Sequence, residues 1–155
     1  MSEVNLEMAK TIYGTVCTAL DNLGLHYKKV EEDLVITFGL KGDDMNHDLL
    51  VVVNPQKEVI QIIEKLPFAI SAEKASDIAI AMSYANDVLL NGKFTSDLKQ
   101  RINYEVTQIY SGSLIGEETI KRMILALVYT VEEYDDKFFA LNKGYITAES
   151  FGEKK

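Results

Sequence analysis

Near the start of the chain, apolar residues recur at spacings of three and four, which is typical of an amphipathic helix. The residues on this apolar face are Met8, Ile12, Val16, Ala19, Leu20 and Leu23. Gly24 follows the last turn, where a left-handed residue ends many helices, and Leu25 stands where it can contact Leu20. The pattern predicts an opening helix that ends in a Schellman-type cap.

After this helix the apolar period changes to two, which indicates strands. The inner face of one strand is predicted to carry Leu34, Ile36, Phe38 and Leu40, and a shorter strand is expected before it at 25–30. The unbroken apolar run 49–53 predicts a strand covered on both faces. A fourth strand from Val59 to about Phe68 should carry Pro67 at its end or on a sheet edge, because proline donates no ladder bond. Short turns between these four strands predict an antiparallel meander.

The second half of the chain returns to helical spacing twice. A helix is predicted from the N-cap Ser71 to Gly92, and a hairpin of strands at 94–95 and 102–106 follows it. A long apolar stripe from Ile120 to Leu141 predicts a final helix, and the tail after Tyr145 is expected to fray. The predicted fold class is α+β: helix, four-strand antiparallel meander, helix, β-hairpin and long C-terminal helix, in one domain over 1–155 with an ordered core at about 4–145.

Composition narrows the possible partners. The chain has 155 residues, 47% of them hydrophobic, and its 24 acidic and 16 basic side chains give a net charge of −8. An acidic chain lacks the clustered basic face of a nucleic-acid-binding protein. Its longest apolar run is far shorter than the roughly 20 residues of a membrane span, and the N-terminus has no apolar segment typical of a signal peptide. We therefore expect no nucleic-acid or membrane partner and a cytoplasmic location.

Few residues are suited to catalysis. The only histidines are His26 and His47, and no serine lies in a nucleophile elbow, so a Ser-His-Asp hydrolase is hard to assemble. The lone Cys17 shares its helix face with Tyr13 and Leu20, where burial would raise the pKa of the thiol and leave it unreactive. The sequence predicts no catalytic residue, no cofactor and no enzyme.

One acidic segment is a candidate ligand site. Residues 43–48, Asp-Asp-Met-Asn-His-Asp, offer oxygen donors and the His47 imidazole within six positions. Their spacing fixes no coordination geometry, so a solvated hairpin loop is the favoured interpretation. A small-ligand or metal-binding domain that uses Asp43 to Asp48 is the alternative function.

Surplus apolar residues mark two of the predicted helices. The second helix carries an additional stripe of Ile80, Tyr84 and Val88, and the last helix has Leu125 and Tyr129 away from its main stripe. A helix with more than one apolar face is either deeply buried or covers a partner. We expect a homodimer, with Ile80, Tyr84 and Val88 at the dimer or partner interface.

Four passages carry a resemblance to a known family. They are Leu34-Val35-Ile36-Thr37-Phe38, the stretch from Asn86 through Asn91-Gly92-Lys93-Phe94, Ile102-Asn103-Tyr104-Glu105, and Gly116-Glu117-Glu118-Thr119-Ile120. With the order of the elements, they resemble the bacterial YbjN family of proposed sensory transduction regulators, over Leu6 to about Asn142. The chain departs from the family pattern in the loop from Ser96 to Gln100, which lacks the glycine expected of a tight hairpin.

The resemblance also implies a fold and a function. The YbjN family is similar in fold to the type III secretion chaperones, which are small, acidic, cytosolic homodimers that bind segments of other proteins. None of the four passages is catalytic. We therefore expect a non-enzymatic cytoplasmic protein-binding module in a regulatory or chaperone-like role, with a subunit of an obligate complex as a further possibility.

Overall fold

The computed structural model describes residues 4–97 and 100–153. Its elements in chain order are α1 (Leu6–Asn22), β1 (Tyr27–Val30), β2 (Val35–Lys41), β3 (Asn46–Asn54), β4 (Val59–Ala69), α2 (Ala75–Val88), β5 (Gly92–Ser96), β6 (Arg101–Ile109) and α3 (Glu117–Asn142). The six strands form one antiparallel sheet in the order β1-β2-β3-β4-β6-β5. The predicted α+β class and order of elements are confirmed.

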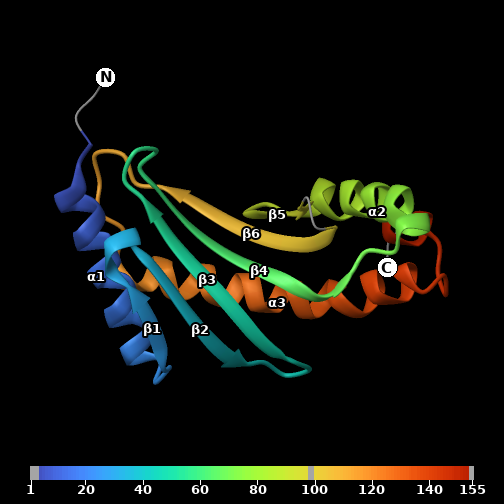
Figure 1. Cartoon of the computed structure of the whole chain (residues 1–155), viewed down its shortest axis with the longest axis horizontal. Helices are drawn as coiled ribbons and strands as arrows, with labels where there is room; N and C mark the ends of the chain where they lie inside the picture. The colour runs from blue at the N-terminus through green and yellow to red at the C-terminus, as the bar shows by residue number, and fades with distance from the viewer. Residues whose placement is uncertain (1–3, 98–99, 154–155) are drawn as a thin grey trace.

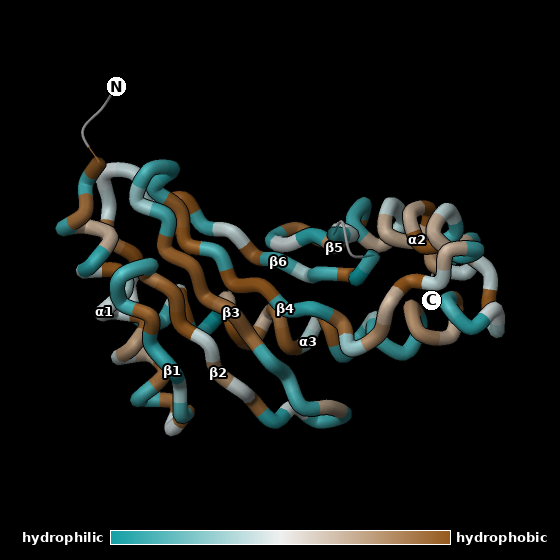
Figure 2. The backbone as a smooth tube through the Cα atoms, in the orientation of Figure 1, coloured by the Kyte–Doolittle hydropathy of each residue, from teal (hydrophilic) through white to brown (hydrophobic). Residues whose placement is uncertain are grey.

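Helices α1 and α3 pack on one face of the sheet, behind it in Figure 1, and α2 lies beside β5 and the end of α3. Alternate strand residues turn inward to meet these helices, so that the covered face holds a continuous hydrophobic core. The predicted inner face of β2 is confirmed, since Ile36 and Phe38 are buried there. Figure 2 shows the corresponding run of apolar residues along the central strands.

The expectation that β3 is covered on both faces is wrong for a single copy of the chain. Leu49, Val51 and Val53 are buried under the helices, whereas Leu50 and Val52 are only partly buried on the opposite face. A continuous apolar run is the rule for strands of parallel sheets, which helices cover on both sides. In this antiparallel sheet the same run instead leaves apolar side chains on the open face.

Two irregular backbone positions lie near the ends of strands. Pro67 lies inside β4, where the pairing with β6 shifts register between Lys65 and Ala69, and a bulge tolerates the missing N–H of proline. In the glycine-free loop between β5 and β6, Gln100 takes the left-handed conformation with φ of 57°. Its carbonyl accepts a bond of 2.7 Å from the N–H of Ile70, which ties this loop to the chain that leaves β4.

The Schellman-type cap predicted for α1 is present, but the N-cap predicted at Ser71 is not: its side chain makes no capping bond, and α2 begins only at Ala75. The N–H of Leu25 donates to the carbonyl of Leu20 at 3.0 Å, that of Gly24 donates to Asp21 at 3.0 Å, and Gly24 has a φ of +70°. These two bonds define the Schellman motif. The end of α3 repeats the arrangement around Gly144, whose φ is +79°. Helix α1 therefore ends where Gly24 predicts, and α3 ends in the same kind of cap.

The tail after Tyr145 is expected from the sequence to fray, but the chain packs against the rest of the molecule up to residue 152. A 3-10 turn at Ala148–Gly152 buries Ala148 and Phe151 against the molecule. The ring of Phe151 lies 4.9 Å from that of Phe138, which in turn lies 4.9 Å from Phe94. Aromatic pairs at this spacing add stability beyond their buried area, so the terminal turn forms part of the core.

The stripe of α3 can be tested by truncating one of its buried residues. Leu127 is fully buried, and Leu127→Ala should lower the free energy of unfolding by about 2–5 kcal/mol, measured by chemical denaturation. Leu125→Ala on the same helix is the matched control, because Leu125 is 56% exposed and its truncation should change the free energy by about 0.5 kcal/mol or less. Equal effects of the two substitutions would contradict the assignment of the core.

Candidate functional site

The most unusual buried group of the structure is His47. It lies on the inner face of β3, is fully buried, and stands between two carboxylates from other elements. Its Nδ1 is 2.9 Å from each oxygen of Glu64 on β4, and its Nε2 is 3.0 Å from Oε1 of Glu132 on α3. Glu64 is itself only 2% exposed. We refer to Glu64, His47 and Glu132 as the buried triad.

The buried triad joins the tip of the β2–β3 hairpin to α3. Besides facing His47, Oε1 of Glu132 accepts a bond of 3.3 Å from the backbone N–H of Asp44. Gly42 closes the turn with a 2.9 Å bond from its N–H to the carbonyl of Met45. A Cβ at Gly42 would overlap the Glu132 carboxylate and come 2.6 Å from Nε2 of His47. Glycine is therefore the residue that lets the hairpin tip approach α3 so closely.

The charges of the buried triad support one another. Burial opposes a charge on His47, but its hydrogen bonds to Glu132 and Glu64 outweigh burial, so that the pKa of His47 is raised. The bond to His47 lowers the pKa of Glu132. Burial raises the pKa of Glu64 against the opposing effect of His47. Acid should therefore protonate Glu64 before Glu132.

The structure does not bring the candidate ligands of residues 43–48 together. His47 points into the core, and both of its ring nitrogens bond to the carboxylates of the buried triad. Asp48 lies exposed on the opposite face of β3. Asp44 meets Glu132 through its backbone N–H rather than its carboxylate. Within residues 4–97 and 100–153, no group of three His, Cys, Asp or Glu side chains is arranged to hold a metal ion.

The sequence analysis missed the two partners of His47, although one signal was present. His47 is in phase with Leu49, Val51 and Val53, the buried side of β3. Extending that alternation by one step would have moved His47 from a solvated loop to the inner face. The carboxylates that meet it come from positions 17 and 85 residues further along the chain, so only the fold pairs them.

The environment of Cys17 agrees with its predicted lack of reactivity. The thiol is partly buried, and burial raises its pKa, although a hydrogen bond with Tyr27 partly opposes the shift. A thiol with a raised pKa holds less of the reactive thiolate at neutral pH. Burial likewise raises the pKa of Tyr27 to about 12.

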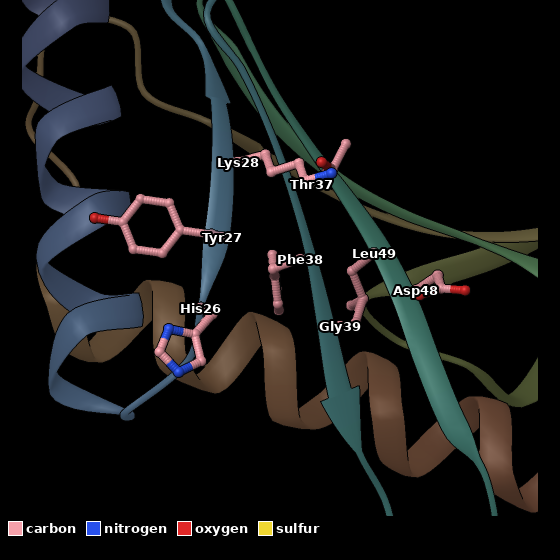
Figure 3. A pocket seen from close by; sticks show the side chains of 8 residues that line it. All are labelled: His26, Tyr27, Lys28, Thr37, Phe38, Gly39, Asp48 and Leu49. Atoms are coloured by element: carbon pink, nitrogen blue, oxygen red, sulfur yellow. The ribbon is translucent and has the colours of Figure 1, made fainter.

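A shallow hollow of about 590 Å³ lies beside the start of β1 and the second half of β2. In Figure 3, Tyr27 projects toward α1, and Asp48 lies away from it on β3. His26, exposed, and Lys28 stand at the rim, but Phe38 and Leu49 below are almost fully buried. The lining thus offers a recess between strands and lacks a set of polar groups that converge on one point, which a small-molecule site requires.

The uncovered face of the sheet carries a cluster of apolar side chains. Its members, which we name the open-face patch, are Val30, Val35, Leu50, Val52 and Ile63. Val35 pairs with both Val30 and Val52, and Leu50 pairs with Ile63, so these side chains stand side by side on three junctions between strands. On β6, beyond Ile63 of the patch, the side chains of this face are polar or charged, among them Glu105, which pairs with Ile63, and Thr107. The patch is an apolar area with a polar border.

A second apolar surface lies on α2. Ile80, Tyr84 and Val88 follow one another at intervals of four and are 44%, 41% and 67% exposed, so this stripe is not deeply buried in a single copy of the chain. The buried side of the helix is formed by Ile78, Ala81, Met82 and Ala85. Leu125 and Tyr129 of α3 are also exposed. Deep burial in a single copy of the chain therefore does not explain the additional apolar residues on either helix.

Two asparagines hold α2 in its place. The side chain of Asn86 donates to the carbonyl of Phe94 at 2.9 Å and accepts from its N–H at 2.7 Å, which fixes β5 against α2. Asn142 at the end of α3 accepts from the N–H of Ser71 at 2.8 Å and donates to the carbonyl of Ala69 at 3.1 Å. These side chains replace ladder and cap bonds that the connecting segments lack.

Comparison with known proteins identifies solved structures of similar fold. No protein-family model matches the chain, and no curated protein sequence does. The ExsC–ExsE complex superposes with a TM-score of 0.59 and 10% identity over 83% of this chain and 93% of that chain. YbjN from E. coli, a candidate transcription regulator, gives 0.59 and 13% over 86% and 93%. The chain shares the fold of YbjN.

The same fold occurs in a third solved structure. The HopA1–SchA chaperone–effector complex gives a TM-score of 0.58 at 13% identity over 86% of this chain and 99% of that chain. At these identities the similarity establishes the fold, and the chaperone-like fold expected from the sequence is confirmed. Among the described residues, no helix is both long enough and apolar enough to cross a membrane.

The fit between Gly42 and the buried triad can be tested directly. Gly42→Ala should displace Glu132 from His47 and lower the free energy of unfolding by about 1–3 kcal/mol, because it leaves buried polar groups without partners. Gly14→Ala in α1 is the control: its Cβ would meet nothing within 4 Å, so helix propensity should raise stability by about 0.5–1 kcal/mol. Thermal or urea denaturation measures both, and a stabilising Gly42→Ala would disprove the close approach.

Proposed function

We propose that the protein is a non-enzymatic cytoplasmic protein-binding module, homodimeric and bacterial, with a regulatory or chaperone-like role. The observation that carries the proposal is the open-face patch, an apolar area that the chain leaves uncovered although it has three helices. Exposed apolar patches with a polar border are typical of protein interaction sites. The fold shared with a chaperone–effector complex supports the same role.

Each of the two apolar surfaces is assigned its own partner. The open-face patch takes an apolar segment of a second protein, because Lys28, Lys65 and Glu105 at its border offer both signs of charge around an apolar centre. The α2 stripe of Ile80, Tyr84 and Val88 takes the same stripe of a second copy, since a helix face can pair with itself about a two-fold axis. A homodimer would then leave the open-face patch free.

Partner binding should depend on the centre of the open-face patch. A partner captured from the native organism by the tagged wild-type protein, identified by mass spectrometry and then purified, should bind Val52→Asp at least about 30-fold more weakly in calorimetry. A charge at the centre of an apolar interface would be buried without a counter-ion.

The matched control for this experiment is Thr107→Asp. Thr107 stands in the same cross-strand row as Val52, two strands away, but is exposed and already polar. Its variant should bind the partner within about threefold of the wild type, as expected for a rim position. Circular dichroism of both variants establishes that they fold. Equal affinity of a folded Val52→Asp variant and the wild type would place the partner elsewhere.

The dimer is tested by light scattering. The wild type should give twice the 17.4 kDa mass of one chain, and the double variant Ile80→Asp/Val88→Asp should give one chain mass while remaining folded. Tyr84 is left unchanged because its ring packs against Gly152. Tyr129→Asp on α3, at a site 72% exposed, should remain dimeric. A wild-type monomer at high concentration would refute the dimer, and a dimeric double variant would refute the interface.

A further inference from the structure

We propose that the buried triad is a proton-dependent lock, which holds the β2–β3 hairpin on α3 while the His47 imidazole carries a proton on both ring nitrogens. The lock is independent of the proposed partner and of the dimer. It links three segments that are distant in sequence: β3 with the hairpin tip, β4 and the middle of α3.

The geometry calls for two ring protons. An ionised carboxylate only accepts hydrogen bonds, so while Glu64 and Glu132 are both ionised, each nitrogen of His47 bonds to its carboxylate only as an N–H donor. Glu64 receives Nδ1 at 2.9 Å on both oxygens, and Glu132 receives Nε2 at 3.0 Å. A neutral imidazole has one N–H, and would leave a lone pair facing one of the carboxylates in a site that is largely shielded from water.

The charges around the triad favour the same state. The other ionisable groups that act on Glu64 are Asp48 of β3 and Asp135 of α3, and Asp44 at the hairpin tip acts on Asp135. All three are acidic, so a positive charge on His47 offsets part of their negative charge. Burial raises the pKa of Asp135 as well.

Losing the proton on Nε2 would release the hairpin tip. Glu132 holds the tip through His47 Nε2 and through the Asp44 N–H, and the first of these bonds exists only with the proton in place. Gly42 lies against the same carboxylate, so a moved Glu132 would disturb the turn. Met45 of the same turn is partly buried against the core, and its side chain would then become more exposed to water.

The raised pKa of His47 sets the alkaline limit of the lock. Because the pKa is raised above 6.5 in the folded protein, the stabilisation is complete below pH 6.5 and is lost as the pH rises through the folded pKa. Toward acid, Glu64 is protonated before Glu132 because burial raises its pKa, so the loss of the Glu64 charge sets the acid limit. The contribution of Glu132, whose pKa is lowered, is present above pH 4.5 and is lost as the pH falls through the folded value. The lock is closed between these limits.

The first test observes the protons in the wild-type protein. At pH 7.5 an ordinary histidine is mostly neutral, so long-range ¹⁵N–¹H NMR should show the two His47 nitrogens at equivalent imidazolium shifts. The exposed His26 gives a reference in the same spectrum. Two inequivalent nitrogens at His47, the signature of a neutral tautomer, would overturn the proposal.

The second test connects the protons with the hairpin. Glu132→Gln keeps the shape of the side chain but removes its charge, so the pKa of His47 should fall toward the ordinary value, and the hydrogen-exchange protection factor of the Asp44 amide should fall about tenfold. Glu133→Gln, an exposed neighbour outside the triad, should change neither quantity. An unchanged His47 pKa in a folded Glu132→Gln variant would overturn the lock.

The wild type alone supplies the same comparison if Glu132→Gln does not fold. As the pH is raised through the titration of His47, the protection factor of Asp44 should fall together with its imidazolium fraction. The amide of Tyr110, which donates to the Glu58 carbonyl at 2.9 Å away from the triad, should keep its protection factor. A protection factor at Asp44 that is independent of the His47 titration would separate the protonation from the hairpin and overturn the lock.

Discussion

A sheet with one covered face is the constraint on which the rest of this structure depends. Alternation sends every second strand residue to the helices, and α1 and α3 supply enough apolar surface for one side only. The residues in between must then face water or another molecule. Polar side chains occupy much of that face on β6 and β5, but β2, β3 and β4 keep Val35, Leu50, Val52 and Ile63 there. The same geometry that builds the core therefore creates the interaction surface.

Helix α3 serves both halves of the molecule. Its stripe meets the central strands, and its far end gathers the aromatic rings around Phe138 with the terminal turn and β5. Midway along it, Glu132 reaches into the β2–β3 hairpin. A 26-residue helix spans much of the sheet, so one rigid element sets the distances among the hairpin tip, the core and the base of α2.

The sequence predicts the parts of the fold that local patterns control, and fails where distant segments meet. Period-two spacing identified the inner face of β2, and Gly24 marked the end of α1, because both signals lie within a few residues. Phe151 carries no such local signal: its burial depends on rings from α3. The sites show the same division. Exposed stripes such as Ile80 and Val88 can be read from helical spacing, whereas the carboxylates around His47 come together only in three dimensions.

The lock and the open-face patch share one ladder of hydrogen bonds. The β2–β3 pairing runs from Val35 opposite Val52, at the patch, to Lys41 opposite Asn46, beside the hairpin tip. Register in an antiparallel pair is a property of the whole ladder, since a slip by one residue would turn every side chain to the other face. A tip fixed to α3 by His47 therefore holds Leu50 and Val52 on the open face and Leu49 and Val51 in the core. A buried ionic cluster is a poor source of net stability, but it is well suited to enforcing one arrangement over its alternatives, and here that arrangement keeps apolar side chains available to a partner.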